Sequence, residues 1–150
     1  MDAHAPTEQS QNLGLNVAAL QQQTAQIRKL AARDREVRAH EQAHAAVGGQ
    51  HASHPHYNLE RGPNGVSYAV SGHVNIDVSE VPGDPQATLE KMQQVQRAAM
   101  APANPSAADR AVAAKAAQAA TQARAEMLQE KSVDVSDAEG TKGAVIDVFL

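Results

Sequence analysis

Two histidines and a glutamate stand at a spacing that suits metal chemistry. The segment HEQAH places His40 and His44 four residues apart, with Glu41 directly after the first histidine. On an α-helix this spacing puts both imidazoles on one face, with Cβ atoms about 6 Å apart, a span that one zinc ion can bridge. Glu41 then lies about 100° further around the helix, beside the ion, where its carboxylate suits a base for metal-bound water. The sequence therefore predicts Zn²⁺ held by His40 and His44, with Glu41 as the catalytic residue.

A catalytic zinc ion needs a third protein ligand and one open position, and short-range spacing does not supply that ligand. The metzincin pattern HExxHxxGxxH is excluded, because Val47 and Gln50 stand where it requires Gly and His. The remaining candidates lie further along the chain and stay open at this point.

Residues 72–78 alternate apolar and polar, which predicts a half-buried strand with His73 and Asp77 on its polar face. These two residues are the leading candidates for the third ligand. A rise of roughly 13 Å over four strand residues makes it unfavourable for both to reach one ion. Glu90 and Glu126, on later helices, are the other candidate ligands. The alternative without a metal-binding role is that His73 and Asp77 simply face water.

Five other polar residues near the predicted hairpin have two interpretations each. His51, His54 and His56 form an H-x-x-H-x-H loop that could bind a second metal or donate a hydrogen bond to a reaction intermediate, although such loops are usually solvated. Tyr57 and Tyr68 could stabilise a developing oxyanion, but in a chain with so few aromatic residues, packing is the better interpretation.

The elements that must position these residues begin with one long helix. Residues 1–12 are polar and Gln-rich and are predicted to be a disordered tail. From Leu13 to Val47 apolar residues recur at helical spacing, which predicts a long amphipathic helix, broken at most once. Gly48 and Gly49 follow and suit a left-handed C-terminal cap, so the helix should end just after the HEQAH segment.

A hairpin and two further helices are predicted next. Residues 57–61 and 66–70 flank the turn sequence GPNG, which is typical of a β-hairpin. A helix should start at Asp84 and Pro85 and end before Pro102. An Ala-rich helix should run from the capping-box-like Ser106 and Asp109 to about residue 131, followed by a tail with a short strand over 143–150. The four cap residues, Asp84, Pro85, Ser106 and Asp109, receive no catalytic role.

Composition narrows the classes of function. The chain has 150 residues, the size of one domain, and residues 13–131 are predicted to form it. A net charge of −4 without basic runs argues against nucleic-acid binding, and the absence of cysteine excludes thiolate zinc sites. The N-terminal residues do not form a signal peptide and no window is apolar enough to span a membrane, so a cytoplasmic protein is expected, with signal-independent export left open.

The segments REVRAHEQAHAAVGGQ and RGPNGVSYAVSGHVNIDVSEVPGDPQATLEKMQQVQRAAMAPANPSAADRAVAAKAA resemble the SprA-related metalloprotease family, over about residues 30–130. The resemblance implies a zinc peptidase with His40 and His44 as ligands and Glu41 as catalytic residue. It also favours His73 as third ligand, because that family commonly has Glu at this position and either residue can bind zinc.

These observations together predict an α+β, minimal zincin-like fold: a long active-site helix, a small antiparallel sheet and C-terminal helices. The predicted function is zinc-dependent hydrolysis of peptide bonds in a peptide or protein substrate. Two alternatives remain: a zinc-binding domain whose site is closed by a fourth ligand, and an Ala- and Gln-rich helical interaction protein in which the HEQAH segment is incidental. The oligomeric state is not readable.

Overall fold

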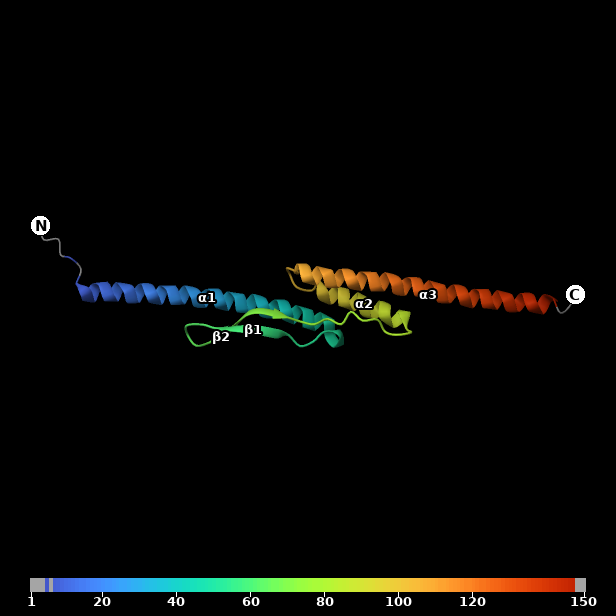
Figure 1. Cartoon of the computed structure of the whole chain (residues 1–150), viewed down its shortest axis with the longest axis horizontal. Helices are drawn as coiled ribbons and strands as arrows, with labels where there is room; N and C mark the ends of the chain where they lie inside the picture. Colours follow the sequence, from blue (N-terminus) through green and yellow to red (C-terminus); the bar gives the residue numbers. More distant parts are fainter. Residues whose placement is uncertain (1–4, 6, 148–150) are drawn as a thin grey trace. The chain divides into compact units, whose positions relative to one another are not determined.

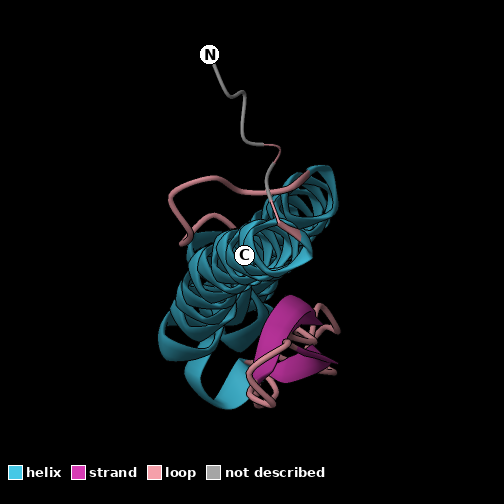
Figure 2. Cartoon of the chain, turned by 90° about the vertical axis from the view of Figure 1, so that its left-hand side faces the viewer, coloured by secondary structure: helices cyan, strands magenta, loops and turns pink. Residues whose placement is uncertain are grey.

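The computed structural model describes residue 5 and residues 7–147, with side-chain surroundings described as far as residue 134 (Figure 1). Its elements, in chain order, are helix α1 (Glu8–Gly48), a short 3-10 helix η1 (Gly49–His51), strands β1 (His56–Arg61) and β2 (Ser67–His73), and helices α2 (Pro85–Ala99) and α3 (Ala107–Asp147). The two strands, magenta in Figure 2, form one antiparallel hairpin. The predicted α+β class is confirmed: a long N-terminal helix, a two-stranded hairpin and two C-terminal helices.

The described chain divides into two compact units. One comprises α1 as far as Gln42 together with Pro55–His73, and the other comprises Ala43–His54 together with the chain from Val74 onward. The prediction of a single domain over 13–131 stays a prediction. No helix in the described part of the chain has the length and apolar character needed to cross a membrane.

Helix α1 is a single unbroken helix that ends where the sequence predicted. Gly49 has φ of +53°, a backbone conformation that glycine adopts without a Cβ clash, so the α-helix stops after Gly48. Its start differs from the prediction, because helix already begins at Glu8, inside the segment expected to be disordered. The Thr7 carbonyl accepts from the amide of Gln11 at 3.1 Å, and an established helix extends at little cost per added residue. The expected disorder at residues 1–4 and 6 lies outside the described residues.

The hairpin docks on α1 through a bulge in β2. Pairing shifts after Asn58, which leaves Val70 without a partner residue on β1. Both backbone groups at this bulge are bound by α1: Arg33 Nε donates to the Val70 carbonyl at 2.9 Å, and the Ala69 amide donates to Asp34 Oδ1 at 2.8 Å. Two hydrogen bonds hold the pKa of Asp34 below its ordinary value: the larger contribution comes from the amide of Ala69 and the smaller from the guanidinium of Arg38. The predicted hairpin is confirmed, and its position on the helix is set by backbone hydrogen bonds.

Residues 74–78 do not form the separate strand that their alternation suggested. β2 ends at His73, and beyond it only Ile76 makes an isolated bridge, to Ala52. Two flanking hydrogen bonds join this segment to the loop after α1: Asp77 N to His51 O at 2.8 Å and Ser53 N to Asn75 O at 2.8 Å. The alternating burial is nevertheless present. The segment is extended because it is hydrogen-bonded to the loop after α1. It forms no strand because that loop is too short to support a β-ladder.

Helices α2 and α3 pack on each other through small side chains. The core of this unit contains Met92, Val95, Ala116 and Ala120, all at most 2 % exposed, with partly buried Ile76 and Val78 against it. The start of α2 is confirmed, since Asp84 Oδ1 accepts from the amide of Ala87 at 3.0 Å. The end of α3 is a correction: the helix continues to Asp147, so residues 143–147 are helical where a short strand was expected, and residues 148–150 lie outside the described part.

Candidate metal centre

His44 lies in the last turns of α1 and is held by a backbone carbonyl. Its side chain is 4 % exposed, and its Nδ1 lies 2.8 Å from the carbonyl oxygen of Ala98, at the end of α2. A carbonyl oxygen can only accept, so Nδ1 carries a hydrogen and donates it. The lone pair of a neutral ring is therefore on Nε2. Such a hydrogen bond fixes the tautomer and the ring orientation of a metal-binding histidine.

The Nε2 atom of the same ring faces a carboxylate, 3.2 Å from Oδ1 of Asp109. Two lone pairs at that distance repel each other unless a positive charge stands between them. A hydrogen or a metal cation shared by Nε2 and Oδ1 removes this repulsion. The ring thus lies between the Ala98 carbonyl and the Asp109 carboxylate, an arrangement that suits a metal-binding histidine.

Asp109 is positioned by the start of α3. The Ser106 amide donates to Asp109 Oδ2 at 2.8 Å, and the Asp109 amide donates to Ser106 Oγ at 3.0 Å. This reciprocal pair is a capping box, as the sequence predicted. Because Oδ2 is used by the cap, Oδ1 is the oxygen that faces His44. The carboxylate, with 18 % of the side chain exposed, is thus fixed by the cap through Oδ2 while Oδ1 faces the ring.

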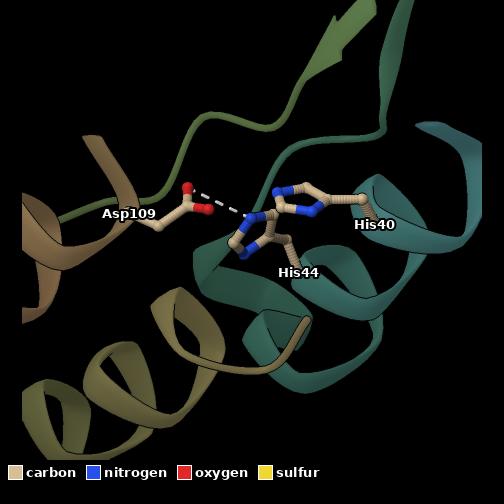
Figure 3. A group of neighbouring side chains, drawn as sticks. All are labelled: His40, His44 and Asp109. Carbon is tan, nitrogen blue, oxygen red and sulfur yellow. Dashed lines mark ion pairs between the residues drawn. The ribbon is translucent and has the colours of Figure 1, made fainter. Parts of the chain in front are cut away.

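His40 completes the group from one turn earlier in the same continuous helix. One ligand atom from each of His40, His44 and Asp109 lies within 4.8 Å of the others (Figure 3). In a tetrahedral zinc site, ligand atoms about 2.1 Å from the ion are about 3.4 Å from one another, so a small inward movement of the side chains would suffice. Two imidazoles and one carboxylate match the ligand types of catalytic zinc sites, and three ligands leave one coordination position open.

Glu41 is the buried acid next to this group in the chain. It is 7 % exposed and makes no hydrogen bond or ion pair within the described residues. Its Cγ lies close to β2, since a Cβ built on Gly72 would come within 3.0 Å of it and within 2.9 Å of the His56 carbonyl oxygen. Gly72 therefore leaves the room in which the stem of Glu41 lies.

The structure places His73 elsewhere on the hairpin. His73 ends β2 directly opposite His56, and their rings stack with centroids 5.1 Å apart and planes inclined by 23°. Both residues are exposed. Among the described residues, the group of possible ligands contains Asp109 in the place for which His73 was expected.

Asp77, the alternative third ligand, is engaged by other groups. Its carboxylate accepts from the Ser79 hydroxyl at 2.6 Å and from Lys91 Nζ at 2.9 Å. These hydrogen bonds, that of Ser79 first and then that of Lys91, hold the pKa of Asp77 well below its usual range. An ammonium group in contact with the carboxylate disfavours a second cation there, so the observed role of Asp77 is to neutralise a buried lysine.

The remaining candidates make local contacts outside the group of three. His51 lies in η1, and His54 is exposed in the loop that follows. The guanidinium of Arg38 lies 4.9 Å from the ring centroid of Tyr57, and Tyr68 accepts from Asn64 at 2.8 Å, so both tyrosines belong to the packing of the hairpin. Glu90 and Glu126 each accept from a glutamine one turn earlier in their helices.

Asp109 is the site residue that the sequence did not indicate. Its spacing from Ser106 marks a helix cap and nothing more, and it is far from His44 in the chain. No local pattern connects the two residues. Only the packing of α3 beside the end of α1 brings them together, and both belong to the same compact unit.

The fold and the site define an α+β protein in which a histidine pair on a long helix lies close to an aspartate from the N-terminal cap of another helix. The SprA-related family model matches residues 6–148, and the chain therefore belongs to the SprA-related family. Comparison with curated proteins gave no match, and comparison with solved structures gave none either.

Proposed function

We propose that this protein is a zinc-dependent metallopeptidase with His40, His44 and Asp109 as ligands and Glu41 as catalytic base. The observation that carries the proposal is the setting of His44. One ring nitrogen donates to the Ala98 carbonyl, and the other lies 3.2 Å from the Asp109 carboxylate, so a cation at the second nitrogen satisfies both groups. His40 then supplies the third ligand atom from the same helix face.

The burial of Glu41 supports the role of a base. Glu41 is only 7 % exposed and has no hydrogen-bond or ion-pair partner in the described residues, yet its oxygens are not buried, so its carboxylate is largely enclosed and still open to a water molecule. Zinc in the site would supply Lewis acidity to the substrate carbonyl and acidify a water molecule. Glu41 would accept a proton from the attacking water and pass it to the leaving amine.

The outer edge of β1 supports an extended peptide as substrate. The other edge of the hairpin is used, because Arg33 and Asp34 bind the backbone of β2. Along β1, Tyr57 is half-buried and the remaining residues are exposed. An extended chain adding to β1 would gain backbone hydrogen bonds irrespective of its sequence, which suits a peptidase that contacts the main chain of its substrate.

Metal content and turnover test the two parts of the proposal separately. Wild type, His40→Ala, Glu41→Gln and Glu36→Gln are purified, their zinc content is measured, and each is incubated with a mixed peptide library. Glu36 is the matched control, a glutamate on the same helix with a side chain that is 74 % exposed. We expect near-stoichiometric zinc in all proteins except His40→Ala, and peptide hydrolysis in the wild type and Glu36→Gln alone.

Three outcomes would contradict the proposal at different points. Wild type that binds no zinc would remove the metal site. Zinc retained by His40→Ala would place the ion elsewhere in the chain. Zinc bound by the wild type without hydrolysis of any library peptide would favour a zinc-binding domain without turnover.

A further inference from the structure

The N-terminal half of α1 is a helix whose side chains are all in contact with solvent. Every residue from 8 to 26 is exposed. Large apolar side chains are among them, namely Leu13 at 65 %, Leu15 at 68 %, Val17 at 52 % and Leu20 at 63 %. Helices in proteins gain most of their stability by packing an apolar face, and a solvated helix of this length that contains Gly14 is marginal in water. This segment therefore needs a partner to cover it.

The apolar residues of this segment follow a heptad repeat. Leu13, Val17, Leu20, Thr24 and Ile27 succeed each other at alternating spacings of four and three, which puts Val17 and Thr24 at a positions and the others at d. The Thr24 hydroxyl donates to the Leu20 carbonyl at 2.8 Å, so it is satisfied within the helix and the methyl group is left to pack. A shallow groove on this face is lined by Val17, Leu20, Gln21, Thr24, Ala25 and Arg28. We call the five heptad residues the α1 seam.

The seam ends where the helix starts to cover its own hairpin. Beyond Ile27 the buried hydrophobic residues of α1 are Leu30 and Val37, and Asp34 binds the backbone of β2. Those positions are used within the unit, so only residues 13–27 are available to a partner. The heptad repeat and the exposed stretch thus coincide in the chain.

We propose that the α1 seam pairs in parallel with the same seam of a second copy of this chain. A β-branched residue at a with leucine at d, as in Val17 with Leu13 and Leu20, favours parallel, two-stranded coiled coils. The flanking positions permit identical helices to meet, because Asn16, Gln21 and Gln23 are uncharged and Arg28 would face Gln23 of the other copy. No like charges oppose each other along the seam, so the seam of one copy is complementary to the identical seam of another.

Leu15 provides an internal control for this proposal. It is as exposed as Leu13 and Leu20 but lies at an f position, away from the seam. Molar mass is measured by sedimentation equilibrium over the micromolar concentration range for the wild type, Leu20→Lys and Leu15→Lys. Both substitutions are at exposed positions and lysine is a good helix former, so both variants should fold. We expect a dimer for the wild type and Leu15→Lys, and a monomer for Leu20→Lys.

Orientation is tested with single cysteines in a chain that has none of its own. Thr24→Cys, in the seam, should form an intermolecular disulfide under mild oxidation, because identical a positions are adjacent in a parallel pair. Gln22→Cys, at an f position, should not. A monomeric wild type, a dimer that survives Leu20→Lys, or a dimer in which Thr24→Cys fails to cross-link would overturn the proposal.

Discussion

Oδ1 of Asp109 lies 3.2 Å from Nε2 of His44, while Oδ2 of the same carboxylate accepts the Ser106 amide. One side chain thus starts helix α3 and faces the ring that the HEQAH helix presents. The two oxygens have separate partners, so the acid can be a single-oxygen ligand without losing the cap. The candidate metal group and the start of α3 share this residue.

Replacing Asp109 by Asn should separate these two roles. Asn keeps one acceptor oxygen for the cap but removes the negative charge that faces His44, so we expect zinc affinity to fall at least about tenfold. Asp84→Asn is the matched control, because the Asp84 carboxylate also accepts a backbone amide at the start of a helix, as the N-cap of α2, and lies outside the metal group. Competition with a chromophoric chelator measures the affinities, and equal affinity in the two variants would remove Asp109 from the site. Stability of the metal-free proteins should change by at most about 1 kcal/mol in either variant.

Gly72→Ala should disturb the surroundings of Glu41. A Cβ at this position would lie 2.9 Å from the His56 carbonyl oxygen and 3.0 Å from Glu41 Cγ, so the hairpin must shift. We expect a lower free energy of unfolding and, if the peptidase proposal holds, a loss of turnover at unchanged zinc content. Gly14→Ala is the control: it has nothing within 4 Å and lies inside a helix, so it should stabilise by about 0.5–1 kcal/mol. Urea denaturation compares them, and equal effects would contradict the close contact at Gly72.

Met92→Ala should be among the most destabilising single changes in the α2–α3 unit. Met92 is fully buried in a core whose other members are mostly alanines, which cannot move in to fill the space. Large-to-small substitutions of this kind cost about 2–5 kcal/mol. Met100→Ala, at a residue that is 46 % exposed, should cost much less. Chemical denaturation of both variants tests this, and similar losses would mean that the core is not where the structure places it.

Stability should depend on pH through Asp77. The hydroxyl of Ser79 and the ammonium of Lys91 lower its pKa in the folded state, whereas in the unfolded chain an Asp has a pKa of about 3.9. The folded state therefore gains stability from this ionised carboxylate above about pH 4, and loses it as the pH falls toward the folded pKa. In urea titrations, the difference in unfolding free energy between wild type and Asp77→Asn should shrink below that pH. A difference that stays constant with pH would contradict this role. The side chain is half exposed, so the effect should be modest.

Local patterns in the sequence predicted most of the elements because the causes of those elements are themselves local. Gly49 stops α1, the GPNG turn joins β1 and β2, and Asp84 caps α2, each through contacts within a few residues. The histidine pair was predictable for the same reason, since one helical turn sets its spacing. These features require no knowledge of distant residues.

The structure differs from the sequence-based predictions mainly where contacts with residues distant in the chain determine the local structure. The segment 74–78 reads as an independent strand, yet its partner is the loop around Ala52, which supports a single bridge. The length of α3 was underestimated, because the Ala-rich pattern predicted a helix only to about residue 131 and the helix continues to Asp147. The third residue of the metal group came from packing of α3 beside His44, and no spacing rule connects positions so far apart in the chain.

Ala98 and Asp109, which contact the two nitrogens of His44, lie near the end of α2 and the start of α3, and α3 packs on α2 through the small residues Ala116 and Ala120. The spacing between α2 and α3 therefore sets the positions of the two groups that contact the imidazole. One extra methylene between these helices would widen the spacing and misalign the Ala98 carbonyl, the His44 ring and the Asp109 carboxylate together. Alanines that never approach the ion would then be as intolerant of enlargement as the ligands are of replacement. Sequence variation in this protein should therefore be restricted at these alanines, which have no chemistry of their own, as well as at the three residues of the metal group.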